Sequence, residues 1–125
     1  MPTGYLEHAN ITVSDPDRLS GLLQNLCGWH ERWRGPSAQS GWSLHVGNDD
    51  CYLALYTRGD GTPLPRHDKS LPLNHIGIVV KDLVAADTIV REAGLEPYGH
   101  ETYEPGSRFY FFDWDGIEFE IVSYG

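Results

Sequence analysis

Two histidines and one glutamate in this chain of 125 residues form a set that can bind a divalent metal ion: His8, His75 and Glu120. Two neutral imidazoles and a carboxylate make a facial triad, which leaves coordination positions open for water or substrate. Glu120 lies between Phe119 and Ile121 in an apolar, aromatic stretch. A charge buried there without a partner is costly, and a bound cation would supply that partner. We therefore predict a metal site at these three residues.

The alternative role for the two histidines is structural, because a histidine on a sheet is usually satisfied by hydrogen bonds. Two histidines at equivalent positions of a repeat, with a carboxylate in register, favour the metal site. Glu118 lies nearest the predicted turn and is expected to be solvated. Three further histidines show no such pattern and are expected at the surface or in loops: His30, His45 and His67.

The element that must position Glu120 is a predicted hairpin over Arg108–Ser123. Aromatic and β-branched residues dominate both arms, and the Asp-Gly dipeptide at 115–116 is a strong signal for a tight turn. Alternation in the second arm separates two faces. One face carries Ile117, Phe119 and Ile121, and the other carries Glu118, Glu120 and Val122.

The first half of the chain is predicted to form a strand, a helix and three more strands. A strand over Tyr5–Val13 precedes a helix with Asp15 as its N-cap and Pro16 at its first position. Leucines follow at helical spacing, and Gly28 ends the helix. Strands are predicted over 29–34, 42–46 and 51–57. The segment 58–72 is rich in proline and glycine and is predicted to be a linker.

The second half repeats this order. A strand over 73–80 precedes a helix that begins at Asp82 and closes at Gly94, followed by a short strand at 95–98, a polar loop at 100–106 and the hairpin. His75 follows His8 by 67 residues (75 − 8), and Glu120 follows Ala54 by 66 (120 − 54). Such self-similarity suggests two copies of one βαβββ unit. We expect both histidines and Glu120 to face one concavity.

The predicted fold class is therefore α+β, with one domain over residues 1–125. Its first module spans about 4–58, its linker about 59–71 and its second module about 72–125. The net charge of −9 argues against nucleic acid and anionic membranes as partners. Cys27 and Cys51 are isolated, and the N-terminus shows no secretory signal. These features favour a cytoplasmic protein with a small-molecule substrate.

The segments LEHANITV, LNHIGIVV and FYFFDWDGIEFEIV resemble the vicinal oxygen chelate superfamily, over nearly the whole chain. This superfamily includes glyoxalase I, bleomycin resistance proteins, fosfomycin resistance thiol transferases and extradiol dioxygenases. The resemblance implies a half-open barrel of two modules around one divalent ion, such as Fe, Mn, Ni, Zn or Co, and a homodimer. His8, His75 and Glu120 fall on the ligand positions of the family.

Departures from the family pattern bear on the reaction. Glyoxalase I has a second glutamate where this chain has Ala54, so a four-ligand site is not expected. Three ligands resemble the fosfomycin enzymes and the extradiol dioxygenases. The dioxygenases also place a tyrosine ten residues before the glutamate, which matches Tyr110, and an acid–base histidine near the position of His100. Both residues are candidates for catalysis beside Glu120.

The resemblance and the strand alternation also indicate substrate-binding residues. Arg108 is predicted to share a face with Tyr110 and to pair with an anionic substrate. Asn10 follows the first histidine at a position that the fosfomycin enzymes use. Aromatic and apolar residues of the first module are expected to form the pocket wall on one face: Trp42, Leu44, Tyr52 and Tyr56.

Two classes of function follow. The first is a metal-dependent enzyme (a lyase or isomerase, a transferase or a dioxygenase) acting on a small substrate that chelates the metal through vicinal oxygens. The second is a non-catalytic binding protein of the bleomycin-resistance type. Intact candidate ligands favour the enzyme, whereas the acidic net charge would suit a cationic drug. An extradiol-type dioxygenase is a further alternative within the first class.

Overall fold

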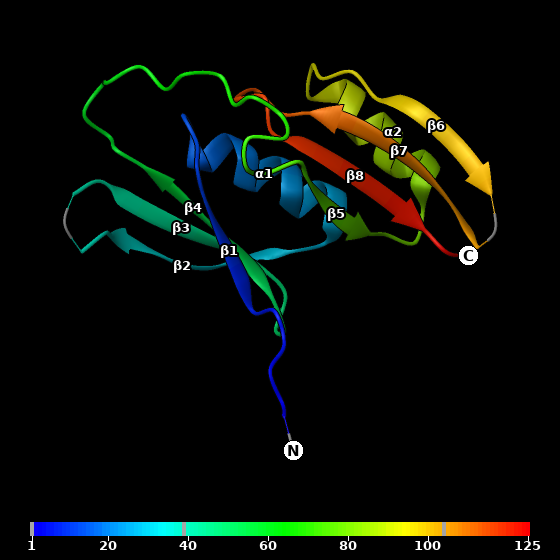
Figure 1. Ribbon diagram of the computed structural model, residues 1–125, viewed down its shortest axis with the longest axis horizontal. Helices are drawn as coiled ribbons and strands as arrows, with labels where there is room; N and C mark the ends of the chain where they lie inside the picture. Colours follow the sequence, from blue (N-terminus) through cyan, green and yellow to red (C-terminus); the bar gives the residue numbers. More distant parts are fainter. Residues whose placement is uncertain (1, 39, 104) are drawn as a thin grey trace. The chain divides into compact units, whose positions relative to one another are not determined.

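The computed structural model describes residues 2–38, 40–103 and 105–125 and shows two halves of the same βαβββ order (Figure 1). The first half contains β1 (His8–Thr12), α1 (Pro16–Cys27), β2 (His30–Pro36), β3 (Trp42–Gly47) and β4 (Tyr52–Thr57). The second contains β5 (His75–Val79), α2 (Leu83–Glu92), β6 (Tyr98–Tyr103), β7 (Gly106–Phe112) and β8 (Glu118–Ser123). The predicted α+β class with two βαβββ modules is confirmed.

Each half forms its own four-stranded mixed sheet, ordered β1-β4-β3-β2 in the first and β5-β8-β7-β6 in the second. The first strand of each half pairs in parallel with the last, and the other pairs are antiparallel. Both sheets are open. The chain divides into two compact units, Met1–Gln24 with Gly28–Pro63 and Asn25–Cys27 with Leu64–Gly125.

Strand pairing places the two histidines at the same position of the repeat. His8 on β1 pairs with Tyr52 on β4, and His75 on β5 pairs with Glu118 on β8. Two residues further along the strands, the partners are Asn10 with Ala54 in the first sheet and Gly77 with Glu120 in the second. Ala54 therefore occupies the position in the first half that Glu120 occupies in the second.

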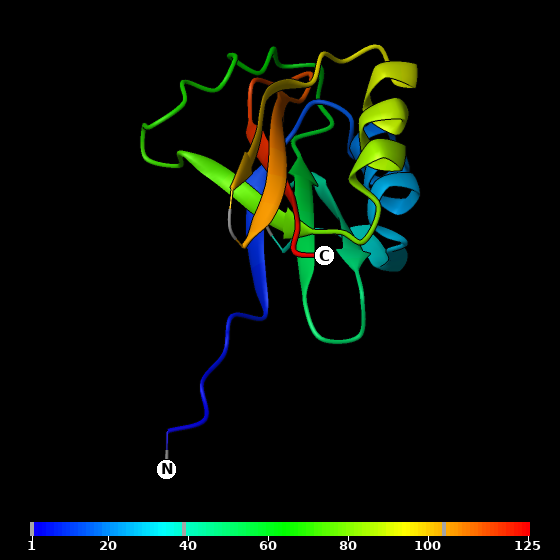
Figure 2. The same cartoon turned by 90° about the vertical axis from the view of Figure 1, so that its right-hand side faces the viewer.

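Both helices begin at the predicted caps. The Asp15 carboxylate accepts a hydrogen bond from the Arg18 backbone N–H at 3.1 Å, and Gly28 ends α1 with a φ of 68°. The Asp82 carboxylate accepts from the Ala85 N–H at 3.0 Å. In the second unit, α2 lies against β7 and β8 (Figure 2). No helix among the described residues is long and apolar enough to cross a membrane.

The core of the second sheet consists of aromatic and branched side chains on one face. Phe109, Phe111, Phe119 and Ile121 are completely buried, and the rings of Phe111 and Phe119 stack at 5.3 Å. Because neighbouring residues of a strand alternate between faces, the opposite face carries polar side chains. We call it the polar face of the second sheet, defined by Arg108, Tyr110, Glu118 and Glu120.

The loop predicted at 100–106 is wrong in its first part, since β6 runs from Tyr98 to Tyr103. Every residue of β6 is exposed, so the strand shows no apolar alternation. Gly99 has a φ of 68°, and the register with β7 shifts between Tyr98 and Glu101. An exposed edge strand with a bulge lacks the period-2 pattern that identifies strands from sequence.

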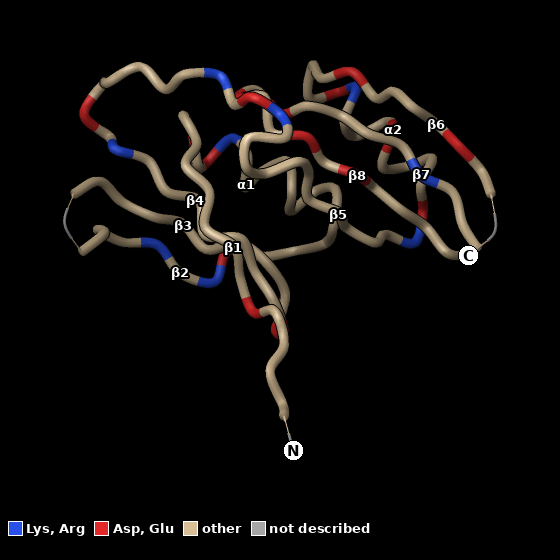
Figure 3. The backbone as a smooth tube through the Cα atoms, in the orientation of Figure 1, with Lys and Arg blue, Asp and Glu red and all other residues tan. Residues whose placement is uncertain are grey.

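Part of the predicted linker is attached to the second sheet. The His67 backbone N–H donates to Asp115 O at 2.7 Å, and the His67 side chain makes a 2.9 Å hydrogen bond through Nε2 to Leu73 O. Lys69 forms an ion pair with Glu118. Figure 3 shows charges of both signs along this segment. Residues 66–73 therefore form an ordered strap, which we call the linker strap.

The hairpin turn is confirmed, and Asp113 organises it. Its Oδ1 accepts hydrogen bonds from the backbone N–H groups of Asp115 and Ile117, both at 2.9 Å, and Gly116 adopts a φ of 87°. The Asp113 side chain is buried, and no described residue donates a hydrogen bond to its Oδ2. The turn thus depends on one carboxylate oxygen.

Asp113→Ala is expected to lower the free energy of unfolding by about 1–3 kcal/mol, because two backbone donors lose their acceptor. Asp113→Asn keeps a side-chain oxygen at the Oδ1 position and serves as the matched control, with most of the stability retained. Urea denaturation of the three proteins measures the difference. Equal losses in both variants would show that the hydrogen bonds to Oδ1 are not what stabilises the turn.

The buried Asp113 carboxyl also predicts that the stability of the protein depends on pH. Burial raises the pKa of the Asp113 carboxyl above its ordinary value. The folded state then binds this proton more tightly than the unfolded state, so the contribution of Asp113 to stability falls as pH rises through the raised pKa. Asparagine does not titrate. Between about pH 4 and about pH 7 the stability difference should therefore shift in favour of Asp113→Asn, and a difference independent of pH would contradict this.

Candidate metal centre

Glu120 on the polar face of the second sheet contacts a histidine and an arginine through different oxygens. Its Oε1 lies 3.0 Å from Nε2 of His75, and its Oε2 accepts a hydrogen bond from the Arg108 guanidinium at 2.8 Å. The Glu120 side chain is only 12% exposed. The structure thus brings together three of the residues that sequence analysis singled out, from strands β5, β7 and β8.

The other nitrogen of His75 is already engaged. Nδ1 lies 2.7 Å from the side-chain oxygen of Asn74, to which it donates a hydrogen bond when it carries the ring proton. In the neutral imidazole, Nε2 then has the free lone pair and faces Glu120. Two acceptors 3.0 Å apart repel each other unless a proton or a cation lies between them.

His8 repeats this arrangement in the first unit. Its Nδ1 lies 2.8 Å from Oε1 of Glu7, the residue immediately before it. Metal-binding histidines commonly donate their second ring N–H to a carboxylate or carbonyl oxygen, which fixes the tautomer and the ring orientation. The Glu7–His8 and Asn74–His75 pairs therefore both leave Nε2 as the nitrogen available to a metal.

The residues present fit a divalent ion. Two ligand atoms at right angles, each about 2.1 Å from a metal, lie about 3.0 Å from each other, which is the separation of His75 Nε2 and Glu120 Oε1. Gly77, the strand partner of Glu120, leaves space beside it, since a Cβ there would meet no atom within 4 Å. Among the described residues, no group of three or more histidine, cysteine or acidic side chains is gathered around a metal position.

Arg108, predicted to contact substrate, is held in place by two side chains. Its NH1 bonds to Glu120, and its guanidinium lies 4.5 Å from the centre of the Tyr103 ring. Burial alone would lower the pKa of Arg108, but the hydrogen bond to Glu120 outweighs it and raises the pKa. Among the described residues, none accepts a hydrogen bond from its buried Nε.

Tyr110, which precedes Glu120 by ten residues, lies directly opposite it in the β7–β8 register. Its ring meets that of His75 edge-on at 6.1 Å between centres. Burial and the nearby Glu120 charge raise the pKa of the Tyr110 hydroxyl, which therefore keeps its proton near neutral pH. The hydroxyl is a hydrogen-bond donor on the same face as the Glu120 carboxylate.

The expectation that Glu118 is solvated is wrong. Its side chain is 3% exposed, forms an ion pair with Lys69 Nζ at 2.6 Å and accepts a hydrogen bond from the Tyr98 hydroxyl. Proximity to the turn does not expose it, because the linker strap supplies Lys69 and β6 supplies Tyr98. Sequence analysis missed both partners, since one was placed in a linker and the other at the end of a short strand.

The suggestion that His100 acts together with Glu120 is contradicted by its position. His100 Nε2 lies 2.7 Å from Asp87 on α2, and its ring stacks on Phe109 at 5.4 Å. Phe109 belongs to the buried face that α2 covers, which is opposite to the face of Glu120. The bulge at Gly99 determines which side of β6 His100 occupies.

The structure places the residues predicted for the pocket wall of the first module on two different faces of its sheet. Tyr52 and Tyr56 on β4 share a face with His8 and Asn10, as expected. Trp42 and Leu44 lie on the opposite face, because they pair with Thr57 and Leu55 rather than with the tyrosines. Leu44 is fully buried. The four-residue connection between Gly47 and Tyr52 sets this register.

His45, expected at the surface, instead lies on that histidine-bearing face. Its ring stacks on Tyr52 at 4.6 Å, and Tyr52 in turn stacks on His8 at 4.8 Å. Arg32 covers Tyr52, with its guanidinium carbon 4.5 Å from the ring centre. Burial, followed by the positive potential of His8 and Arg32, lowers the pKa of His45. The rings of His8, Tyr52 and His45 therefore form a stacked row that begins at the candidate ligand His8.

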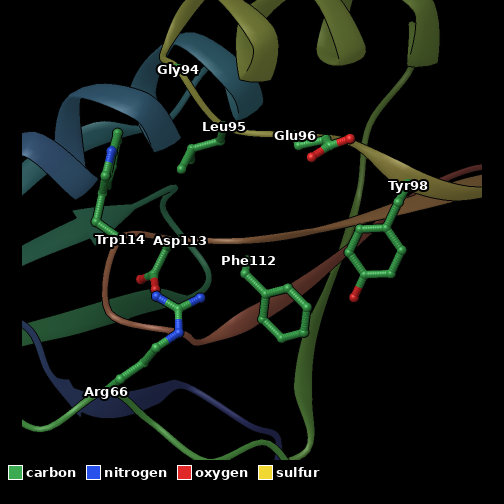
Figure 4. A pocket seen from close by; sticks show the side chains of 8 residues that line it. All are labelled: Arg66, Gly94, Leu95, Glu96, Tyr98, Phe112, Asp113 and Trp114. Atoms are coloured by element: carbon green, nitrogen blue, oxygen red, sulfur yellow. The ribbon is translucent and has the colours of Figure 1, made fainter.

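A cavity of about 630 Å³ opens at the end of the second sheet, beside Tyr98 (Figure 4). Its walls combine aromatic, apolar and charged side chains: Arg66, Gly94, Leu95, Glu96, Tyr98, Phe112, Asp113 and Trp114. The rings of Tyr98 and Phe112 stack at 5.6 Å, and in Figure 4 the Arg66 guanidinium points toward the Asp113 carboxylate. The volume lies within the range of small-molecule pockets.

No protein-family model matches the sequence, and no curated protein matches it. Solved structures do match over nearly the whole chain. A glyoxylase/bleomycin resistance protein/dioxygenase domain from Frankia sp. EAN1pec is 19% identical with a TM-score of 0.81, and the match covers 99% of this chain and 100% of that one. A glyoxalase family protein from Enterococcus faecalis is 17% identical with a TM-score of 0.71, covering 94% and 96%.

A third match carries a metal. A mutant of the fosfomycin resistance protein FosX from Listeria monocytogenes, complexed with Mn(II) and 1S,2S-dihydroxypropylphosphonic acid, is 17% identical with a TM-score of 0.75. The match covers 100% of this chain and 95% of that one. The chain thus has the fold of the glyoxalase/bleomycin resistance/dioxygenase proteins, as the sequence resemblance predicted.

Proposed function

We propose that this protein is a metal-dependent enzyme whose small-molecule substrate chelates a divalent ion through adjacent oxygens. His8, His75 and Glu120 hold the ion. The observation that supports this is the contact between His75 Nε2 and Glu120 Oε1 at 3.0 Å, with Nδ1 of the same histidine bonded to Asn74. Among the fold relatives, FosX was crystallised with Mn(II), which makes Mn(II) the first ion to test.

When bound, the ion supplies Lewis-acid stabilisation of negative charge on substrate oxygens. Arg108 keeps one oxygen of Glu120 occupied, so this carboxylate offers the ion a single oxygen. Tyr110 presents a protonated hydroxyl on the same face and hydrogen-bonds to a substrate oxygen there. The cavity beside Tyr98 accepts the part of the substrate that extends away from the chelated oxygens.

Calorimetric titration of metal-free protein, purified without a histidine tag, tests the metal centre. Mn(II), Ni(II), Zn(II) and Fe(II) are titrated separately, the last without oxygen, and one ion per chain is expected for at least one metal. Absence of saturable binding for all four would overturn the proposal. The bleomycin-resistance type of protein, which binds a ligand without catalysis, would then be the better description.

An extradiol-type dioxygenase is the reaction that the geometry disfavours. Such an enzyme needs an acid–base histidine near the metal ligands, whereas His100 contacts Asp87 and Phe109 on the opposite face of the sheet. Protein loaded with Fe(II) without oxygen and then mixed with catechol and air is therefore expected to show no oxygen uptake above the rate of free Fe(II). Uptake at rates of about 1 s⁻¹ or more, typical of enzymes, would contradict this expectation.

A further inference from the structure

The cavity beside Tyr98 has in its wall a buried carboxylate with one oxygen that lacks a hydrogen-bond partner. Asp113 lines the cavity and is 2% exposed. Its Oδ1 accepts hydrogen bonds from two backbone N–H groups of the turn, whereas no described residue donates to Oδ2. A buried polar atom without a partner is costly. A ligand that donates a hydrogen bond to Oδ2 would remove that cost.

Arg66 brings the opposite charge to the same wall. In Figure 4 its guanidinium points toward the Asp113 carboxylate. Burial raises the pKa of the Asp113 carboxyl, and the Arg66 charge acts against that shift. The stem of Arg66 packs against the turn, because a Cβ on Gly116 would meet its Cγ at 2.7 Å. Arg66 is exposed, so its guanidinium can turn aside from Oδ2 when a ligand enters.

The other walls of the cavity are mainly flat and apolar. The rings of Tyr98 and Phe112 stack at 5.6 Å, and Leu95 and Trp114 line the cavity with them. The Tyr98 hydroxyl already donates to Glu118, so Tyr98 offers the cavity its ring rather than a polar group. Aromatic walls with few polar groups favour a planar ligand.

Arg66 and Asp113 balance each other's charge, so a charged ligand end would leave one charge in excess at this wall. A carboxamide is neutral and presents an N–H donor beside a carbonyl acceptor. We propose that the cavity binds a planar group ending in a carboxamide, whose N–H donates to Asp113 Oδ2 and whose carbonyl accepts from Arg66. That this group is one end of the substrate rests on the proposed function, whereas its binding to the cavity requires no metal.

Titration of the metal-free protein with benzamide, in the presence of a chelator, tests the site. The probes are the backbone amides of Asp115 and Ile117, because both donate to the other oxygen of Asp113. Their nitrogen-15 NMR shifts are expected to saturate with a Kd on the order of 1 mM, as for a small fragment. Benzoate, which offers only acceptors, and N,N-dimethylbenzamide, which lacks the N–H, should bind at least about 10-fold more weakly.

Asp113→Asn changes the hydrogen-bond pattern of the wall and keeps an oxygen for the turn. Its amide nitrogen replaces Oδ2, so both this residue and Arg66 then donate. Benzamide should bind at least about 10-fold more weakly than to the parent, and benzoate should now bind more tightly than benzamide. Asp50→Asn, at an exposed position of the first unit, makes the same change of charge and should bind benzamide as the parent does. A merely structural role of Asp113 would weaken all probes alike.

Arg66→Met covers the case in which Asp113→Asn does not fold. It keeps an apolar stem against Gly116 and removes the donor, so benzamide should bind about 10-fold more weakly. Unchanged benzamide binding in either variant would overturn the proposal, as would equal affinities of the parent for benzamide and benzoate. If benzamide binds as expected but no metal does, the proposed function fails and the carboxamide site stands. If metal binds but benzamide does not shift Asp115 and Ile117, only the carboxamide site fails.

Discussion

Glu120→Ala is expected to weaken Mn(II) binding more than 100-fold, beyond the range typical for the loss of an outer partner. The substitution removes the only negatively charged ligand of the proposed set, and two neutral imidazoles hold a hard cation poorly. It also leaves His75 Nε2 without the oxygen that lies 3.0 Å away. Calorimetry with metal-free parent and variant under the same buffer measures the ratio of dissociation constants.

Glu92→Ala provides the control for this comparison, because Glu92 is an exposed glutamate on α2 in the same unit. Its removal changes net charge equally but touches neither strand of the polar face. If Glu120→Ala binds each metal as tightly as Glu92→Ala does, the proposed ligand set is wrong.

Arg108→Met is expected to destabilise the metal-free protein by about 3 kcal/mol. Breaking a buried ion pair leaves an uncompensated charge, which typically costs 3–5 kcal/mol, and this pair is almost buried, with side chains 14% and 12% exposed. Glu120 retains some exposure to water, so the lower end of that range applies. Urea denaturation in the presence of a chelator gives the free energy of unfolding.

Arg91→Met is the matched control for Arg108→Met. Arg91 pairs with Asp87 on the surface of α2 and is 57% exposed, so its loss should cost less than about 1 kcal/mol. Saturating Mn(II) should raise the free energy of unfolding more in Arg108→Met than in the parent, because the ion replaces the positive charge that the variant lacks beside Glu120. Equal stabilisation of both proteins by Mn(II) would show that Arg108 is not part of the metal centre.

Local signals explain why much of the fold was predictable. Asp15 and Asp82 cap their helices by accepting hydrogen bonds from nearby backbone N–H groups, and Asp113 accepts one within its own turn. None of these contacts spans more than four residues, so the sequence pattern contains all the partners. The internal repeat then relates His8 to His75 without any knowledge of packing.

The rest depends on contacts between distant segments. Glu118 is buried because Lys69 and Tyr98 contact it from distant parts of the chain, and the sequence near Glu118 gives no indication of these partners. His100 lies on the face opposite to Glu120 because the register of the exposed strand β6 shifts at Gly99, which has a positive φ. Trp42 was assigned to the face of Tyr52 and Tyr56, whereas its strand partner is Thr57, whose side chain lies on the opposite face.

The Glu7–His8 and Asn74–His75 contacts have a consequence for how such a chain arises. Each joins adjacent residues, so it is preserved whenever the segment is copied, whatever the surrounding structure becomes. Duplication of one ancestral half would deliver two imidazoles that are already oriented, before any second carboxylate had been selected. Ala54 and Glu120 then mark an equivalent position at which the two copies differ.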